Sequence, residues 1–169
     1  MDKVRDNINQ FIESIQAEYR FQGKKILEVG VGLLDHNKQL FSGNDYLASD
    51  VYETPHTNII LDITKPETFD AIFESTFDLV IVSEVLEHVY EHRKAFEALQ
   101  KIVKPEGYVL ITVPFEYQEH GEDYWRYTGR TLDRLLSEYG FQTIVSREGF
   151  DGDRKTNIFR LAQYSGNIK

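Results

Sequence analysis

Short apolar runs alternate with helical segments along this chain of 169 residues, and this alternation limits the possible folds more than any other feature. The run FDLVIVS at 77–83 is almost wholly apolar, as expected of a strand that is covered on both faces. Strands that alternate with helices form a mostly parallel sheet with helices on both faces. Ligands of such sheets bind beyond the carboxyl ends of the strands.

The spacing of apolar residues and the turn residues predict seven strands and five helices. The sheet is expected to be Rossmann-like and mostly parallel, with a C-terminal antiparallel strand. The predicted strands are 25–30, 45–50, 58–63, 77–83, 107–115, 141–149 and 156–164. The predicted helices are 3–20, 37–41, 66–73, 89–103 and one that begins after Thr128 and ends at Gly140.

Composition excludes several classes of protein. The chain has no cysteine, so disulfides, thiolate metal sites and cysteine nucleophiles are excluded, and a cytoplasmic location is expected. The N-terminal MDKVRDNINQ lacks an apolar signal region, and no apolar run approaches the ~20 residues that span a bilayer. The net charge of −9 argues against nucleic acid as a partner. The oligomeric state is left open.

Glycines follow the first predicted strand, in KILEVGVG at 25–32. Gly30 and Gly32 permit a tight turn and let the backbone approach a ligand closely. Asp50 ends the second strand, twenty residues after Gly30, where a carboxylate can accept both hydroxyls of a ribose. The combination predicts a cofactor that contains adenosine.

Two carboxylates indicate which cofactor this is. Asp35 occupies the last position of the dinucleotide pattern GxGxxG/A, where a pyrophosphate would bind, and Glu28 lies inside the first strand. Both disfavour a diphosphate. A carboxylate at Glu28 suits a cofactor with a positive end, such as the ammonium and sulfonium of S-adenosylmethionine.

With these motifs, residues 24–148 resemble the class I S-adenosylmethionine-dependent methyltransferases. ILEVGVG resembles the first motif of the family, YLASD its ribose-binding motif, LDI its adenine-binding segment, and FDLVIVSEVLEHV and LQKIVKPEGYVLITVP its fourth-strand and following stretches. Many members have a third glycine where this chain has Leu34. The cofactor-binding residues implied by the resemblance are Glu28, Gly30, Val31, Gly32, Asp50, Val51, Asp62, Ile63, Ser83 and Glu84.

The resemblance implies one methyltransferase domain over residues 1–169. Its parts would be an N-terminal helix within 1–22, a cofactor-binding half at 23–115 and a substrate-side half at 116–169. The segment EYQEHGEDYWRYT at 116–128 leaves the fifth strand toward the site, and DYWRYT resembles a subgroup linked to glycan or envelope-polysaccharide assembly. A small-molecule or saccharide acceptor is therefore expected. The substrate-binding candidates are Tyr117, Tyr124, Trp125 and Arg126.

Each of these side chains also has a simpler interpretation. The aromatic residues could pack the rim of the sheet, and Arg126 could pair with Glu122 or Asp123 instead of binding an anionic substrate. The expected reaction is in-line displacement of the sulfonium methyl group by an oxygen or nitrogen nucleophile. Histidine is the natural general base near neutral pH. His120 is the first candidate and His88 the second, although His88 could instead bond to the backbone at the start of a helix.

Other motifs are weaker. His88 to His92 matches the HxxEH pattern of certain zinc peptidases, but the match straddles a strand end and a helix, and no metal is predicted. Tyr90 and Lys94 imitate the catalytic pair of short-chain dehydrogenases, but after the wrong strand. A nicotinamide-dependent oxidoreductase is disfavoured by Glu28 and Asp35. A catalytically idle relative that binds cofactor or partners stays open as an alternative.

Overall fold

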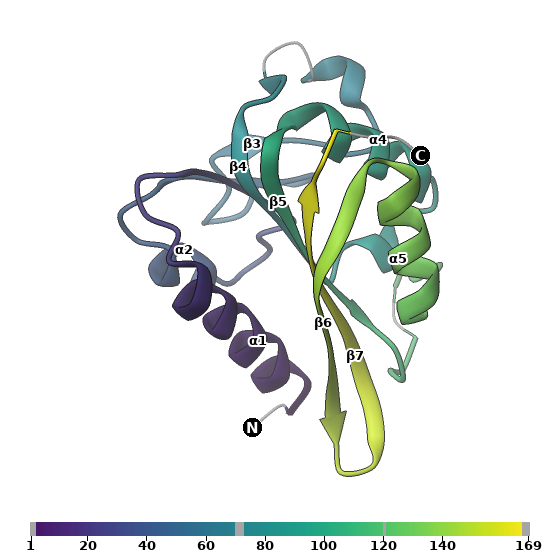
Figure 1. The fold of residues 1–169 in the computed structure, drawn as a ribbon. Coiled ribbons are helices and arrows are strands. Elements are labelled where there is room, and N and C mark those ends of the chain that lie inside the picture. The colour runs from purple at the N-terminus through teal and green to yellow at the C-terminus, as the bar shows by residue number, and fades with distance from the viewer. Residues whose placement is uncertain (1–2, 70–72, 120, 167–169) are drawn as a thin grey trace.

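The computed structural model describes residues 3–69, 73–119 and 121–166. Its seven strands form one sheet in the order β3-β2-β1-β4-β5-β7-β6 (Figure 1). Strands β1 to β5 pair in parallel, whereas β7 is antiparallel to both β5 and β6. The predicted fold class, a mostly parallel Rossmann-like sheet with an antiparallel C-terminal strand, is confirmed.

The strands and helices occur in the predicted order along the chain. The strands are β1 (Lys25–Val29), β2 (Asp45–Asp50), β3 (Ile59–Ile60), β4 (Phe77–Ser83), β5 (Val103–Pro114), β6 (Phe141–Asp151) and β7 (Arg154–Tyr164). The helices are α1 (Lys3–Tyr19), α2 (His36–Leu40), α4 (His92–Ile102) and α5 (Gly129–Glu138), with short 3-10 helices η1 (Pro66–Thr68) and η2 (Leu86–His88).

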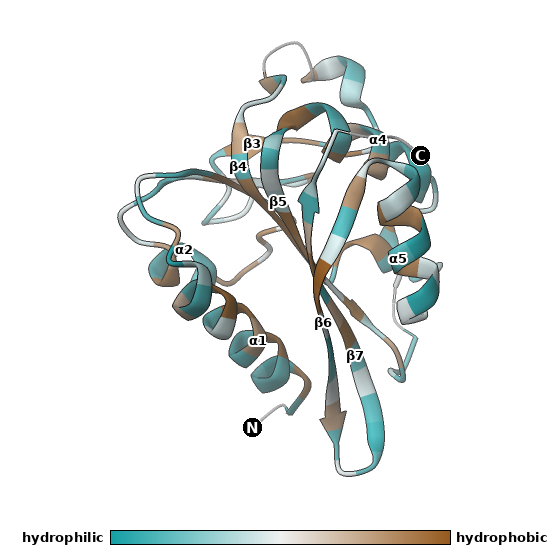
Figure 2. Ribbon diagram, in the orientation of Figure 1, coloured by the Kyte–Doolittle hydropathy of each residue, from teal (hydrophilic) through white to brown (hydrophobic). Residues whose placement is uncertain are grey.

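Successive residues of the central strands enter two different cores, because side chains alternate across a sheet. Leu27 and Val29 of β1 join the core beneath α4 and α5. Ile26 joins the core beneath α1, where Phe11 stacks on Phe159 with ring centroids 4.8 Å apart. The hydropathy colouring shows this layering, with apolar strands between helices that turn their polar side outward (Figure 2). Burial on both faces explains the continuous apolar runs in the sequence.

The third strand is shorter than the predicted 58–63, and local side-chain bonds explain why. The side-chain oxygen of Asn58, and not its backbone carbonyl, accepts from the Ala48 backbone N–H. Asp62 then accepts from the backbone N–H and the hydroxyl of Thr64, at 2.9 and 2.7 Å. Such a turn diverts the backbone from the sheet. Only Ile59 and Ile60 remain in regular pairing.

The fourth predicted helix, 89–103, begins instead at His92. The Trp125 indole N–H lies within hydrogen-bond distance of the carbonyl oxygens of Val89 and Tyr90, at 3.1 and 3.2 Å. Val89 is therefore held in an extended conformation, with φ −100° and ψ 97°. A residue more than thirty positions away decides where this helix starts, which periodicity along the chain does not reveal.

The remaining boundaries agree more closely. The cap at Thr128 is confirmed, because its hydroxyl accepts from the Thr131 backbone N–H at 3.1 Å. The predicted turn before the fifth strand forms an irregular segment within β5, whose register moves from Val103 opposite Phe77 to Tyr108 opposite Leu79. Of the predicted helix 66–73, the structure shows η1, and residues 70–72 lie outside the described part.

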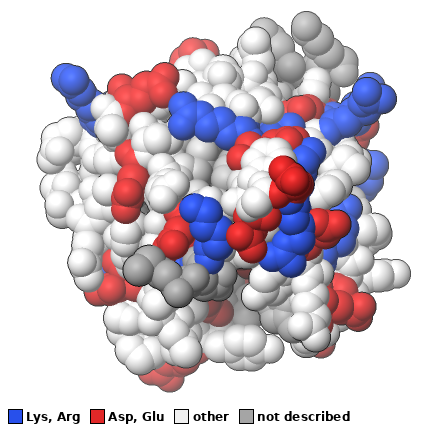
Figure 3. All heavy atoms as spheres, turned by 90° about the horizontal axis from the view of Figure 1, so that it is seen from below, with Lys and Arg blue, Asp and Glu red and all other residues white. Residues whose placement is uncertain are grey.

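The face at the carboxyl ends of the parallel strands is the one seen from below in Figure 3. Acidic and basic side chains are interspersed on it, with no broad field of one sign (Figure 3). Among the helices that the structure describes, none is both long and apolar enough to cross a membrane.

Candidate active site

Two adjoining cavities lie where the strand order reverses, beyond the carboxyl ends of β1, β2 and β4. The larger cavity has a volume of about 940 Å³ and the smaller about 400 Å³. Among the described lining residues, Gly30 and Glu84 are shared by both cavities. This is the place at which open α/β sheets bind ligands.

The turn after β1 needs its first glycine for two reasons. Gly30 has a φ of +76°, which side-chain-bearing residues rarely adopt, and a Cβ there would lie 2.4 Å from Cγ2 of Val85. Gly32 has a φ of +58°, and its backbone N–H donates to Oδ2 of Asp50 at 2.9 Å. The turn is thereby tied to the end of β2.

Glu28 is buried on the side of the smaller cavity and already has partners. The Asn37 side-chain amide donates to Oε1 at 2.6 Å, and the Tyr46 hydroxyl donates to Oε2 at 2.8 Å. Burial raises the pKa of Glu28, and these two hydrogen bonds partly oppose the rise. A carboxylate in this setting gains from a nearby cation, which agrees with the predicted role of Glu28.

Asp50 and Asp62, two of the carboxylates that line the larger cavity, are also held by the backbone. Asp50 accepts from Gly32 and, at 3.2 Å, from the Tyr52 N–H. Asp62 accepts from Thr64 and pairs with Lys65 at 3.1 Å, and these hydrogen bonds and the lysine charge lower the pKa of Asp62 against a rise from burial. Both side chains are thus held in place as hydrogen-bond acceptors at the cavity wall.

All ten predicted cofactor residues line one or both cavities. The smaller cavity contains Glu28, Gly30, Val31, Gly32, Ser83 and Glu84. The larger cavity contains Gly30, Asp50, Val51, Asp62, Ile63 and Glu84. The structure therefore brings together a set of residues that is spread over more than fifty positions in the sequence. Their role in binding stays a prediction.

Glu84 stands out by its backbone and its partners. It has a φ of +53°, an unusual value for a residue with a side chain, and such strain is concentrated at functional sites. Its carboxylate accepts from the Thr112 hydroxyl at 2.9 Å and faces the Asn157 amide, which is 3.4 Å from both oxygens. Burial raises the pKa of Glu84.

Thr112 and Asn157 were not predicted as site residues. Thr112 lies on β5 and bonds to Ser83 at 2.8 Å as well as to Glu84. Asn157 lies on β7, about seventy positions from Glu84 in the sequence, and both residues are fully buried. Each is a polar residue within an apolar strand pattern, and this is the sequence signal that could have found it. Only the strand pairing shows that both residues contact Glu84.

The buried Glu87 is a second unusual carboxyl. Burial and the neighbouring Glu84 charge raise its pKa to about 9, and its Oε2 has no hydrogen-bond partner among the described residues. Its backbone carbonyl accepts from the N–H groups of Tyr124 and Trp125, at 2.8 and 3.2 Å. Glu87 therefore anchors the segment at 116–128 but is absent from the described lining of either cavity.

Of the two candidates for the general base, only His88 lies within the described residues. His88 lines the larger cavity, with Nδ1 2.5 Å from the Glu122 carbonyl oxygen and Nε2 3.6 Å from Oε1 of Glu87. His120 lies outside the described residues. Among the described residues, no group of three or more histidine and acidic side chains is placed to hold a metal ion.

Of the four acceptor-side candidates, Tyr124 lines the larger cavity and packs edge-on against Tyr90 at 5.3 Å. Tyr117, Trp125 and Arg126 are not among the described residues that line either cavity. Trp125 packs between Tyr90 and His92, with ring centroids 6.2 and 4.7 Å away. Both terminal nitrogens of Arg126 donate to the Asp123 carboxylate. These contacts fit the simpler interpretations of Trp125 and Arg126.

Helix α1 supplies a part of the site that no motif indicated. Its N-terminal half lies along the smaller cavity, with Arg5, Ile8, Asn9 and Ile12 among the lining residues. The amphipathic pattern of residues 3–20 predicted the helix but not the face of the sheet on which it packs. Arg5 and Asn9, a cation and an amide on the polar side of the first turns, are the sequence signal that this helix could face a ligand.

Comparison with known proteins agrees with this geometry. A family model described as "Methyltransferase domain" matches residues 2–146. A polyketide synthase–nonribosomal peptide synthetase of Aspergillus flavipes is 24% identical over 180 residues. That match covers 89% of this chain but 4% of the relative's own length.

Solved structures share the fold at low sequence identity. The 1,6-didemethyltoxoflavin-N1-methyltransferase of Burkholderia thailandensis, crystallised with 1,6-didemethyltoxoflavin and S-adenosylhomocysteine, has a TM-score of 0.78 at 15% identity, over 97% of this chain and 81% of that one. The CurJ carbon methyltransferase has a TM-score of 0.72 at 15% identity, over 93% and 54%. The predicted methyltransferase class is confirmed by the family model, and the predicted fold by the solved structures. The chain belongs to the methyltransferase-domain family.

Proposed function

We propose that this chain transfers the methyl group of S-adenosylmethionine to an oxygen or nitrogen nucleophile of a small molecule, with saccharides as the favoured acceptor class. The observation that carries the proposal is the pair of cavities that meet at Gly30 and Glu84. One cavity contains the residues expected around the methionine end of the cofactor, and the other those expected around its adenosine.

The residues present fit this cofactor. The Gly30 turn leaves space that a Cβ would fill, and Glu28 offers a buried carboxylate to an ammonium group. Asp50 offers acceptors to ribose hydroxyls, and Asp62 with Ile63 provides an acceptor and an apolar surface for the base. When bound, S-adenosylmethionine supplies a methyl group on a sulfonium that is already activated for displacement.

The outer part of the larger cavity supports a saccharide acceptor. Tyr90 and Tyr124 expose 69% and 46% of their surface there, beside Glu91 and Glu122. Exposed aromatic rings can pack on the apolar face of a sugar, while carboxylates accept hydrogen bonds from its hydroxyls. The resemblance of DYWRYT to glycan-linked methyltransferases points in the same direction.

The chain's own contribution to rate would be mainly positioning. A cofactor with an activated methyl group needs a nucleophile held in line and shielded from water, and good orientation lowers a barrier by ~7–11 kcal/mol. His88 lies at the cavity wall, where it could accept a proton from an acceptor hydroxyl.

Cofactor binding is tested by thermal shift with S-adenosylmethionine, S-adenosylhomocysteine and NADH in parallel. A ligand at 100 times its Kd stabilises the folded state by about 2.7 kcal/mol, which raises Tm by roughly 5–11 °C for a domain of this size. A rise with the two adenosyl compounds but not NADH is expected. No rise with either adenosyl compound would contradict the proposal.

The acceptor is tested by incubating the protein with radiolabelled S-adenosylmethionine and panels of sugar nucleotides, hydroxylated metabolites, amines and carbon acids. Transfer to a sugar nucleotide is expected. Transfer only to amines or carbon acids would keep the enzyme class and reject the saccharide. Cofactor binding without transfer to any panel member would favour the catalytically idle relative.

A further inference from the structure

The junction between the two cavities contains one acid that the mechanism above leaves without a role. Among the described lining residues, Gly30 and Glu84 belong to both cavities, and glycine has no side chain. The sulfur of S-adenosylmethionine is the atom that connects its amino-acid part to its adenosine part. A cofactor that occupies both cavities would therefore have its sulfur at the junction, beside Glu84.

We propose that Glu84 changes its charge together with the cofactor: it is ionised beside the sulfonium of S-adenosylmethionine and protonated beside the neutral thioether of S-adenosylhomocysteine. This inference rests on the proposed function. It makes Glu84 the residue that selects the methyl donor over the spent product. It also makes Glu84 a catalytic residue that can accept the proton of the methyl acceptor.

The surroundings of Glu84 allow both charge states. The Thr112 hydroxyl donates to it, and the nitrogen of the Asn157 amide is 3.4 Å from each of its oxygens. The Asn157 amide oxygen is buried and has no hydrogen-bond partner among the described residues. If the amide turns over, this orphaned oxygen faces Glu84 and can accept from the protonated acid. One side chain can thus serve the carboxylate and the acid in turn.

Opposing influences set the charge balance of this carboxyl. Burial favours its protonated form, while the hydrogen bonds from Thr112 and Asn157 and the charges of Arg5 and Arg126 favour ionisation. Both terminal nitrogens of Arg126 already donate to Asp123, which weakens its effect on Glu84. A sulfonium at the junction adds a positive charge at short range and lowers the pKa of Glu84.

The proton balance of the transfer follows from this change of charge. Glu84 accepts the proton of the acceptor O–H or N–H while a bond forms from that oxygen or nitrogen to the methyl carbon. The carbon–sulfur bond breaks and its electron pair stays on sulfur, so the positive charge beside Glu84 is lost in the same step. The carboxylate becomes more basic as the methyl group leaves, when a proton acceptor is needed.

Calorimetry tests the inference without an acceptor. Binding of S-adenosylmethionine and of S-adenosylhomocysteine is measured in two buffers of different ionisation enthalpy, at several pH values. Between the pKa of Glu84 with sulfonium bound and its higher pKa without, S-adenosylmethionine should release up to one proton and S-adenosylhomocysteine none. In Glu84→Gln the release should vanish, and the affinity for S-adenosylmethionine should fall about tenfold, the equivalent of about one pKa unit, with that for S-adenosylhomocysteine unchanged.

Two further variants make the test specific. Glu87→Gln removes the neighbouring carboxyl, which lies outside the described cavity lining, and should keep the proton release. Glu84→Asp keeps a carboxyl on a residue type that tolerates positive φ, so it should fold and also keep the release. In infrared difference spectra, the carbonyl band of a protonated carboxyl should disappear when S-adenosylmethionine binds, and only in proteins with an acid at position 84.

Three results would overturn the inference. Equal proton release with the two ligands would show that no group responds to the sulfonium. Release that persists in Glu84→Gln, or that is lost in Glu87→Gln, would assign the response to another carboxyl. Binding of neither ligand would overturn the proposed function as well, so the two failures can be told apart.

Discussion

Gly30 and Gly32 have similar backbone conformations but different surroundings, so they form a matched pair at the residue scale. A Cβ on Gly30 would lie 2.4 Å from Val85 Cγ2, whereas one on Gly32 would meet no described atom within 4 Å. We expect Gly32→Ala to lower the free energy of unfolding by about 1–2 kcal/mol through backbone strain alone. Gly30→Ala adds overpacking and should cost about 2–5 kcal/mol.

Urea unfolding of the two glycine variants checks this expectation, with S-adenosylhomocysteine affinity as a second readout. Because the Gly30 position borders both cavities, its variant should also bind the ligand more weakly. Equal stability losses in the two variants would contradict the assignment of a close contact to Gly30.

Glu87 makes stability depend on pH. Its pKa is raised from 4.5 to about 9, so between these values the folded protein keeps a proton that the unfolded chain has lost. Stability should therefore fall as the pH rises through this window. Glu87→Gln removes the dependence and should stabilise the protein by about 1–3 kcal/mol at pH 7.

The check is urea unfolding of wild type and Glu87→Gln at pH 5 and pH 8. The difference in free energy of unfolding between the two proteins should be larger at pH 8. Glu97→Gln, an exposed change on α4, is the control and should leave the pH dependence unaltered. A difference in free energy of unfolding that does not depend on pH would show that Glu87 ionises normally in the folded protein.

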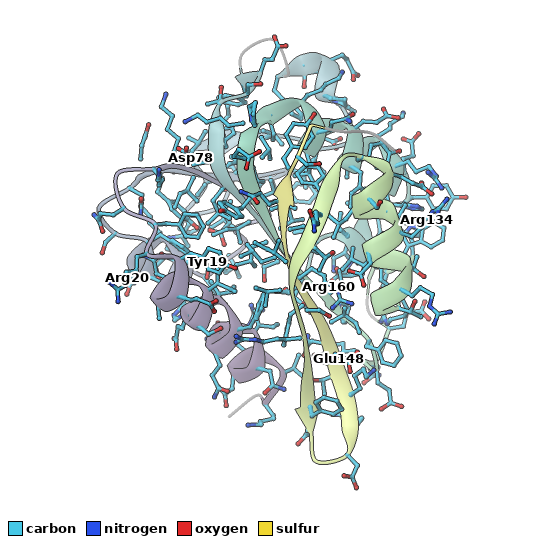
Figure 4. All side chains as sticks on the ribbon, viewed as in Figure 1. Tyr19, Arg20, Asp78, Arg134, Glu148 and Arg160 are labelled. Carbon is cyan, nitrogen blue, oxygen red and sulfur yellow. The ribbon has the colours of Figure 1, made fainter. Side chains whose placement is uncertain are left out.

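At the scale of elements, one ion pair joins α5 to β7. The buried Arg160 guanidinium donates to both carboxylate oxygens of Asp133, at 2.7 and 3.1 Å, and Figure 4 shows Arg160 between the sheet and α5. Asp133 itself keeps 41% of its side chain exposed. Asp133→Ala leaves a buried cation without its carboxylate and should cost about 3–5 kcal/mol.

The matched variant is Arg160→Met, which removes the buried charge and keeps most of the side-chain volume. Asp133 can then turn toward water, so we expect a loss of about 1–2 kcal/mol, smaller than for Asp133→Ala. Thermal unfolding of both variants decides the order. A larger loss in Arg160→Met would show that packing, and not charge burial, dominates this contact.

At the scale of the whole molecule, net charge decides which macromolecules can bind. The charge of −9 and the interspersed signs in Figure 3 leave no basic stripe on that face for a phosphate backbone. We expect duplex DNA and single-stranded RNA to bind no more tightly than about 10⁻⁴ M at physiological salt, as measured by fluorescence anisotropy. Tighter binding that weakens steeply with added salt would contradict this.

The sequence by itself determined the fold class, the order of the elements and the set of residues at the carboxyl ends of the strands. These follow from local patterns: apolar runs for buried strands, glycines for a turn and carboxylates at strand ends. Because parallel strands end at one edge of a sheet, residues such as Asp50 and Ser83 could be placed together before their distances were known.

Only the tertiary structure decided which polar groups meet. Trp125 sets the start of α4, Thr112 and Asn157 reach Glu84 from two other strands, and α1 lies along the smaller cavity. Each of these is a contact between segments far apart in the sequence. Such contacts depend on sheet register and on which face a helix covers, and local periodicity contains no information on either.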